Sequence, residues 1–193
     1  MNKNDIEQRR SLWLAAVKQV VEKCFERESQ FSDLCPQRHL DETTRTEALR
    51  KISTLSKDIS QLVLKLEGIE QKGGLGFTVV LGEVEELEIL VMCLLLGSRL
   101  EVSVARSVRT IQDVMDFVGV RNPSISLKVR SMFRSDGRMF PLVAMGRYIV
   151  LDELTVTLKE SVFNKILGMP SDLVEARCDA EALVGNNKRG MIL

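Results

Sequence analysis

The stretch RYIVLDELTVTL, Arg147 to Leu158, is where the hydrophobic period of the sequence changes from helical to strand-like. Tyr148 and Val150 alternate with other side chains before Asp152 and Glu153, and apolar residues alternate again after this acidic pair. A period of two is typical of a β-strand with one buried face. The sequence therefore predicts two strands joined by a turn at Asp152 and Glu153.

The same acidic pair has a second interpretation, because a strand that ends in acids holds Mg²⁺ in P-loop ATPases. A phosphate site also needs a glycine loop of the pattern G-x-x-x-x-G-K-S/T. The segment GGLGFTVV, residues 73–80, has no lysine, and GNNKRG, residues 185–190, has a different spacing and no Ser or Thr after its lysine. We therefore expect Asp152 and Glu153 to form a hairpin turn, and we expect no ATP binding.

The charges of the chain balance, since 27 basic and 27 acidic residues give a formal net charge of zero over 193 residues. No global field attracts nucleic acid or a membrane, so a charged partner has to be recognised by a local patch. The longest charge-free run, from Ile89 to Ser98, is far below the roughly 20 residues that span a bilayer. The first residues, MNKNDIEQRR, lack the apolar core of a signal peptide. We predict a cytoplasmic protein that does not contact membranes.

The residue types needed for catalysis or metal binding are sparse. The four cysteines form no C-x-x-C pair, and the single histidine, His39, lies in the loop-like segment CPQRH with Cys35. Two ligands do not complete a tetrahedral zinc site, and a nucleophile elsewhere has no obvious histidine base. The acids of GEVEELE, residues 82–88, are expected on the solvated side of a helix start. We predict reduced cysteines, no metal, no cofactor and no enzymatic activity.

Two long amphipathic helices are predicted at the N-terminal end. The first, from Ile6 to Glu28, repeats apolar residues at helical spacing, and the second begins near Asp41. The core positions of the first are Trp13, Val17, Val20 and Cys24, with Leu14, Val21 and Phe25 widening the stripe. The seam of the second is Ala48, Ile52, Leu55, Ile59, Leu62, Leu66 and Ile69. This 3.5-residue repeat fits either the first helix folded back as a hairpin or a homodimer, and both interpretations stay open.

The segment KGGLG, residues 72–76, is interpreted as a hinge, because its glycines leave the backbone unconstrained. We place a domain boundary there. The predicted units are a helical hairpin in residues 1–72, a second domain in residues 77–170, and a weakly patterned tail or linker in residues 171–193.

The second domain is predicted to contain three helices, the β-hairpin and a short closing helix, which is a winged-helix arrangement. Gly97 and Gly119 are expected to end the first two helices, and the third begins with Asn122 as N-cap and Pro123 at the first helical position. The four helices are expected at Glu83 to Leu96, Ser103 to Val118, Arg121 to Phe133 and Lys159 to Leu167. The predicted fold class is mainly α, a long helical hairpin followed by a winged-helix domain.

Several phrases between Val84 and Gly168 resemble the winged-helix domain that precedes the ATPase core in a group of bacterial AAA+ ATPases. They are ELEILVMCLLLG, RNPSISLKVRSMF, PLVAMG and ESVFNKILG. The chain departs from that family in its short predicted wing and in lacking the ATPase core. The resemblance implies that the chain is the N-terminal region of a longer ATPase, with RGMIL, residues 189–193, as a strand just before a P-loop.

Two functions stay open beside a purely structural coiled-coil dimer formed through the Ile52 to Ile69 seam. One is a non-catalytic recognition or adaptor module that positions a partner protein for a motor. The other is DNA binding through the basic helix in residues 123–134, because residues 119–151 carry six basic side chains and one acid, a local net charge of +5. The candidate contacts for nucleic acid or an acidic partner are Arg121, Ser124, Lys128, Arg130, Ser131, Arg134, Arg138 and Arg147.

Overall fold

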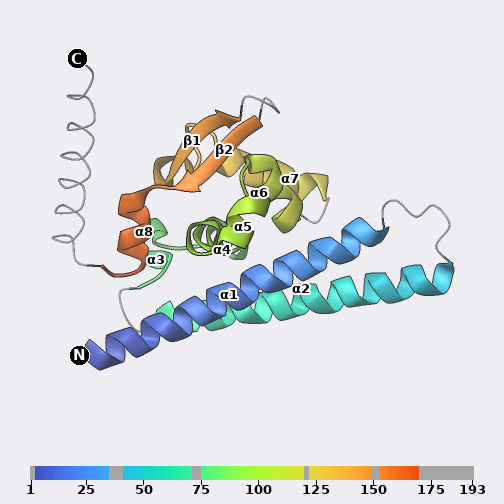
Figure 1. Ribbon diagram of the computed structural model, residues 1–193, viewed down its shortest axis with the longest axis horizontal. Coiled ribbons are helices and arrows are strands. Elements are labelled where there is room, and N and C mark those ends of the chain that lie inside the picture. Colours follow the sequence, from blue (N-terminus) through green and yellow to red (C-terminus); the bar gives the residue numbers. More distant parts are fainter. Residues whose placement is uncertain (1–2, 35–40, 71–74, 120–121, 149–152, 170–193) are drawn as a thin grey trace, which may run out of the picture.

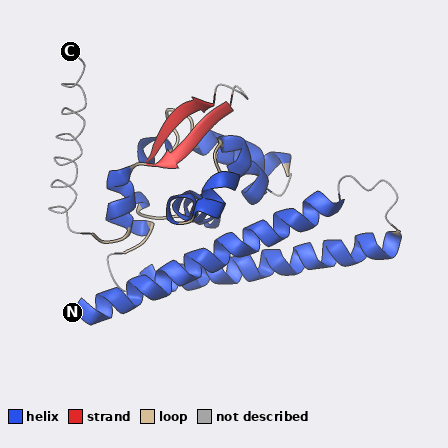
Figure 2. Cartoon of the chain, in the orientation of Figure 1, coloured by secondary structure: helices blue, strands red, loops and turns tan. Residues whose placement is uncertain are grey.

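The computed structural model describes residues 3–34, 41–70, 75–119, 122–148 and 153–169. In these ranges the protein is mainly helical, with eight α-helices and one small antiparallel sheet (Figure 2). Two long helices, α1 (Lys3–Leu34) and α2 (Glu42–Glu70), lie side by side, and the shorter elements pack over one side of this hairpin (Figure 1). The predicted tail in residues 171–193 lies outside the described residues.

The hairpin buries the predicted seam against α1. Asp41 begins α2 as predicted, and its carboxylate accepts a hydrogen bond from the Thr44 backbone N–H at 2.7 Å, which lowers the pKa of Asp41. The buried positions of α2 drift away from a strict 3.5-residue repeat because a straight helix has 3.6 residues per turn. They are Ile52, Leu55, Ile59, Val63, Leu66 and Glu70. Leu62, predicted to lie in the seam, is therefore only half-buried at its edge.

Glu70, at the end of α2, connects the hairpin to the next segment. Its side chain is 4% exposed and accepts hydrogen bonds from Trp13 Nε1 at 2.9 Å, from the Phe77 backbone N–H at 3.0 Å and from the Thr78 backbone N–H at 3.1 Å. The ring of Trp13 also packs edge-on against Phe77, with centroids 5.0 Å apart. A Cβ at Gly76, which has a φ of 102°, would overlap the Glu70 side chain. The described end of the predicted hinge is thus held against the core.

The short helix α3 (Thr78–Leu81) leads to α4 (Glu86–Leu100), which is buried on most sides. The prediction that α4 ends at Gly97 is wrong. Gly97 lies where α4 passes close to α1, and a Cβ there would be 3.1 Å from Val21 Cγ2. The absence of a side chain at this position permits a close helix contact, and the helix continues for another turn.

The single helix predicted from Ser103 to Val118 is in fact two, α5 (Val102–Ser107) and α6 (Ile111–Gly119). Thr110 and Asp113 cap the start of α6 reciprocally. Asp113 Oδ2 accepts a hydrogen bond from the Thr110 backbone N–H at 2.8 Å, and Thr110 Oγ1 accepts one from the Asp113 backbone N–H at 3.1 Å. This capping box favours a new helix start over continuation of the old one.

The sheet consists of β1 (Val143–Tyr148) and β2 (Glu153–Leu158), paired from Val143 opposite Leu158 to Tyr148 opposite Glu153. The prediction that Glu153 lies in the turn is therefore wrong, because Glu153 is the first residue of β2. Residues 149–152, which connect the strands, lie outside the described residues. The register is explained by burial, since Val143 and Leu158 are both buried where the hairpin meets the helices.

The interruption between α5 and α6 supplies a further backbone pairing on the other edge of β2. The Val156 backbone N–H donates to the Arg109 carbonyl oxygen at 2.9 Å, and Thr110 forms an isolated bridge with Thr155. The break in the predicted helix therefore leaves the backbone of Arg109 and Thr110 available to pair with β2.

The start of α7 (Pro123–Met132) confirms the predicted cap, as the Asn122 side chain accepts a hydrogen bond from the Ser124 backbone N–H at 3.0 Å. The closing helix α8 (Glu160–Ile166) is also present, followed by Gly168 with a φ of 61°. These elements lie on the side of α4 away from the hairpin (Figure 1).

One cluster of buried side chains runs from the hairpin through α4 to the sheet and α8. Towards the C-terminal end of α1, the buried side chain of Arg27 donates hydrogen bonds to the carbonyl oxygens of Phe117 at 3.0 Å and Val118 at 3.4 Å. Burial lowers the pKa of Arg27. Phe25 stacks on Phe117, with ring centroids 4.2 Å apart. The last turn of α6 is thus fixed to α1.

Candidate recognition surfaces

The exposed face of α7 carries three of the predicted contact residues, Ser124, Lys128 and Ser131, while Val129 on the opposite side is buried. Leu127 lies on the same exposed face, and 67% of its surface is open to solvent. Single exposed apolar side chains are normal on protein surfaces, so Leu127 alone does not indicate a binding site. The surface is therefore mixed in character rather than purely cationic.

Arg138 is engaged within the protein. Its Nη1 forms an ion pair with Glu88 Oε2 at 2.9 Å, and its Nη2 donates to the carbonyl oxygens of Leu81 at 2.7 Å and Glu83 at 2.5 Å. Glu88 is buried, so the prediction that every acid of GEVEELE is solvated is wrong for this residue. Buried carboxylates need such partners. Arg138 thus contributes much less to the basic surface than its charge suggests.

Arg130 and Arg134 line a cavity of about 490 Å³ between α6, α7 and the β-hairpin. We call this cavity the hairpin groove. Its lining also includes one carboxylate, Glu153. Its apolar lining residues are Ile111, Met115, Phe133, Met145 and Leu154.

Of the remaining predicted contacts, Arg147 borders this groove, because its cross-strand partner Leu154 and its same-face neighbour Met145 both line it. Arg147 is exposed on β1, opposite Leu154 of β2, and Arg121 lies outside the described residues. The structure thus brings Arg130 and Arg134 together in the hairpin groove, leaves Ser124, Lys128 and Ser131 on the exposed face of α7, and separates Arg138 from both.

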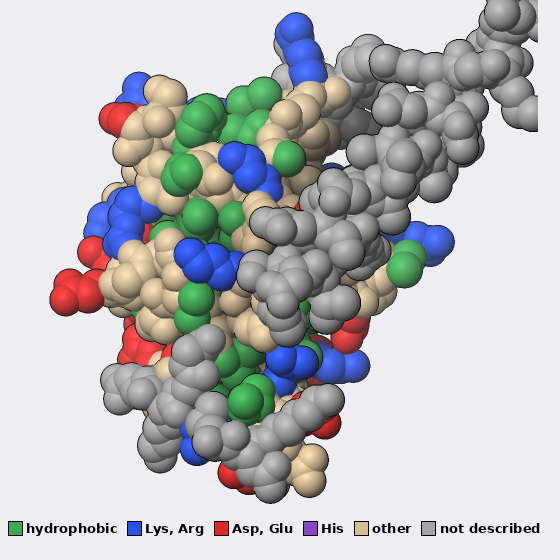
Figure 3. Space-filling view, turned by 90° about the vertical axis from the view of Figure 1, so that its left-hand side faces the viewer, with side chains coloured by type: hydrophobic (Ala, Val, Ile, Leu, Met, Phe, Trp, Pro, Cys, Tyr) green, Lys and Arg blue, Asp and Glu red, His purple; other side chains and the backbone are tan. Residues whose placement is uncertain are grey.

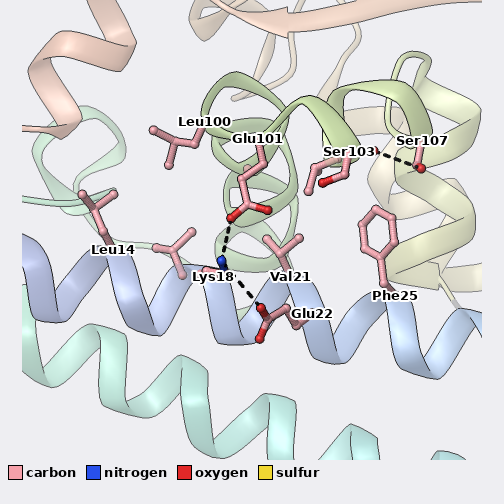
Figure 4. Close-up of a pocket in the computed structure, with 12 residues that line it drawn as sticks. Leu14, Lys18, Val21, Glu22, Phe25, Leu100, Glu101, Ser103 and Ser107 are labelled. Atoms are coloured by element: carbon pink, nitrogen blue, oxygen red, sulfur yellow. Dashed lines mark hydrogen bonds and ion pairs between the residues drawn. The ribbon is translucent and has the colours of Figure 1, made fainter.

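A second cavity, of about 420 Å³, lies between α1 and the junction of α4 and α5 (Figure 4). We call it the helix groove. Its apolar lining residues are Leu14, Val17, Val21, Phe25, Leu100 and Val104. Across the groove, Lys18 Nζ lies 3.1 Å from Glu101 Oε1 and 4.0 Å from Glu22 Oε1, so that an ion pair joins α1 to the end of α4. The hydrogen bond and the charge of Glu101 raise the pKa of Lys18.

The sequence held only an indirect signal of the helix groove. Leu14, Val21 and Phe25 widen the apolar stripe of α1 beyond the positions that face α2. A stripe of that width indicates a second packing partner, but it does not indicate that the partner leaves a cavity. The lining from α4 and α5 is distant in sequence and could not be assigned to it.

The end of the molecule that carries α8 and the start of α1 shows no large surface of one charge. Basic, acidic and apolar side chains interleave there, outside the parts covered by grey atoms (Figure 3). This surface therefore offers no charged patch comparable to the pair of arginines in the hairpin groove.

Within the described ranges, no cluster of three or more His, Cys, Asp or Glu side chains could hold a metal ion. Both described cysteines, Cys24 and Cys93, are buried free thiols. None of the helices in the described part of the chain has the length and apolar character needed to cross a bilayer. Comparison with protein-family models, curated proteins and solved structures gives no match.

Proposed function

We propose that this protein is a non-catalytic recognition module that binds an amphipathic helical segment of a partner protein in the helix groove. The observation that carries this proposal is the apolar lining between α1 and α4–α5, which the ion pair between Lys18 and Glu101 crosses (Figure 4). Leu100, at the open edge of the groove, is 44% exposed. Grooves of this kind bind the apolar face of a partner helix.

The dimensions of the helix groove fit such a partner. Its lining on α1 extends from Leu14 to Phe25, which is roughly 16 Å at 1.5 Å per residue. That length corresponds to about three turns of a bound helix. Lys18, Glu22 and Glu101 pair with one another across the groove, and a partner with charges of both signs on its polar edge would exchange these pairs for its own.

The arrangement of α4 to β2 supports the winged-helix interpretation of residues 77–170. Four helices, α4 to α7, precede the hairpin, with α5 and α6 together in the place of one predicted helix, and the Thr110 bridge to Thr155 adds a third pairing segment to the sheet. Together with the resemblance to the domain that precedes the core of AAA+ ATPases, this order supports a role as an adaptor for a motor. Cytoplasmic location and a homodimer through the Ala48 to Ile69 seam stay predictions.

The helix groove can be tested by selecting helical peptides from a displayed library and mapping them by NMR on the full chain. We expect the selected peptides to shift the amide signals of residues 14–25 and 100–107. The Leu100→Asp variant should weaken their binding by at least about tenfold, or 1.4 kcal/mol. Leu64→Asp, at an exposed position of α2, is the matched control and should leave binding unchanged. Peptides that map to another surface, or a selection that enriches none, would contradict the proposal.

Nucleic-acid binding is the second candidate, and the exposed row of Ser124, Lys128 and Ser131 on α7 favours it. Duplex affinity should then fall steeply with salt, by about 0.9 log units per phosphate contact for each tenfold increase. The change Lys128→Ala, on the exposed face of α7, should lower the affinity and flatten this dependence. Absence of duplex binding at low salt would exclude this candidate.

A further inference from the structure

We propose that the hairpin groove is a second, independent recognition site, which binds a protein segment that places a carboxylate beside an apolar side chain. The site lies between α6, α7 and the β-hairpin, and it shares no lining residue with the helix groove. It therefore goes beyond the function proposed above.

The apolar part of the site is continuous from the core to the surface. Ile111, Met115 and Phe133 are buried, Met145 is half-buried, and Leu154 at the open side is 52% exposed. An exposed large side chain at the end of such a series extends the apolar surface into solvent. A cavity of about 490 Å³ holds a few side chains of a bound segment.

The charged side chains of the site favour an anionic group on the ligand. Arg130 and Arg134 are exposed and line the same groove, and neither takes part in an ion pair or side-chain hydrogen bond within the described ranges. Glu153 is the one carboxylate among the lining residues, against these two guanidinium groups. Gln112, also in the lining, donates to Asp116 at 2.8 Å. Guanidinium groups bind carboxylates through paired, charge-assisted hydrogen bonds.

A peptide carboxylate suits this site better than a phosphate backbone. A duplex would satisfy the arginines, but its backbone offers only sugar C–H groups, and no apolar side chain, to cover Leu154 and Met145. Lys128 distinguishes a duplex from a peptide ligand, because it lies about 200° around α7 from Arg130 at 100° per residue. A duplex lying across α7 would use Lys128, whereas a segment in the hairpin groove would not.

An array of short synthetic peptides tests the proposal with the full chain. In one set, Asp or Glu flanks Leu or Phe at varied spacing, and in the matched set Lys replaces each acid. We expect binding in the acidic set only, measured by fluorescence polarisation. The double variant Arg130→Glu with Arg134→Glu should weaken it by at least about tenfold, the loss expected from one charge-assisted hydrogen bond. Leu154→Ser should weaken it as well.

The control is Lys128→Glu, which reverses a charge on the same helix outside the groove, and we expect it to leave peptide binding unchanged. Leu100→Asp, in the helix groove, should also have no effect. Circular dichroism verifies that each variant is folded. The proposal is overturned if no acidic peptide binds, if the Lys set binds equally well, or if Lys128→Glu is as damaging as the arginine changes. A duplex that displaces the peptide and needs Lys128 would identify a nucleic-acid surface instead.

Discussion

At the scale of single residues, Glu70 is the clearest case of a polar side chain that holds the fold. It accepts hydrogen bonds from three N–H groups, on Trp13, Phe77 and Thr78, in a position closed to solvent. Removing the carboxylate would leave those donors without acceptors, at about 1 to 3 kcal/mol for each buried group. We predict that Glu70→Ala lowers the free energy of unfolding by about 3 kcal/mol or more.

Urea unfolding measures this loss, and the emission of Trp13, the single tryptophan, reports on the site directly. Glu70→Gln keeps one acceptor oxygen and should lie between the wild type and Glu70→Ala. Glu47→Ala is the control, because Glu47 is exposed on the same helix in an i,i+4 ion pair with Lys51. A Glu70→Ala protein as stable as the control would show that the three hydrogen bonds do not hold these segments together.

The Cys24 thiol is predicted to be inert in the folded protein. Burial raises its pKa from an ordinary value of 9.0 to about 11, and burial also raises the pKa of Cys93. At pH 8 roughly one Cys24 side chain in a thousand is then the reactive thiolate. Since the folded pKa is the higher one, its contribution to stability is complete below about pH 9 and is lost as the pH rises towards 11.

Thiol labelling with Ellman's reagent checks this in a chain that carries Cys35→Ser and Cys178→Ser. We expect negligible labelling at pH 8 until denaturant is added, and unfolding midpoints that fall between pH 9 and 11 by more than in a Cys24→Ala variant. Rapid, complete labelling of the native chain would be incompatible with the burial of both thiols.

At the scale of helices and strands, the sequence predicted those features that depend on neighbouring residues. The stripe of α1, the Asp41 and Asn122 caps and the closing helix α8 all depend on residues close in sequence. The failures occurred where a distant contact decides. Gly97 was predicted to end a helix because the sequence does not show that Val21 lies against it. Glu153 was predicted to lie in the turn of the hairpin because the sequence does not show which residues meet the core and set its register.

Apolar positions along α2 differ strongly in burial. Ile59 is fully buried, Leu62 is half-buried and Leu64 is 65% exposed, so three neighbouring positions sample three environments on one helix. An unpaired buried carboxylate costs several kcal/mol, on the order of 3 or more. We predict that Ile59→Asp unfolds the chain, that Leu62→Asp destabilises it less, and that Leu64→Asp has little effect.

Thermal unfolding followed by circular dichroism ranks the three variants. Light scattering tests the alternative interpretation of the seam. If it joins two chains, the wild type is a dimer and Ile59→Asp is a folded monomer. The intramolecular hairpin requires the same mass for the wild type and for Leu64→Asp, and loss of structure in Ile59→Asp.

At the scale of the whole molecule, neither groove could be located from sequence. The helix groove needs α1 and the α4–α5 junction, which are more than seventy residues apart, and the hairpin groove needs α6, α7 and β2. The predicted contact residues could be listed from the sequence, but their places in the fold could not. Packing between distant elements places these residues in three different environments, and no local pattern encodes that packing. Arg138 is bound to Glu88, Arg130 and Arg134 line a groove, and Lys128 lies on an open face.

The buried core continues across the domain boundary that the sequence predicts at residues 72–76. α4 contacts both α1 and α2, and the buried cluster includes Trp13 of the hairpin and Leu158 of β2. A fragment of residues 77–169 would expose the side of α4 that these helices cover. We therefore predict that the full chain unfolds in one transition, with the Trp13 signal and the far-ultraviolet circular dichroism signal coinciding in urea. The isolated fragment should show no cooperative transition and should bind hydrophobic dyes. Two separate transitions in the full chain, or a fragment that unfolds cooperatively by itself, would instead establish residues 72–76 as a boundary between independently stable domains.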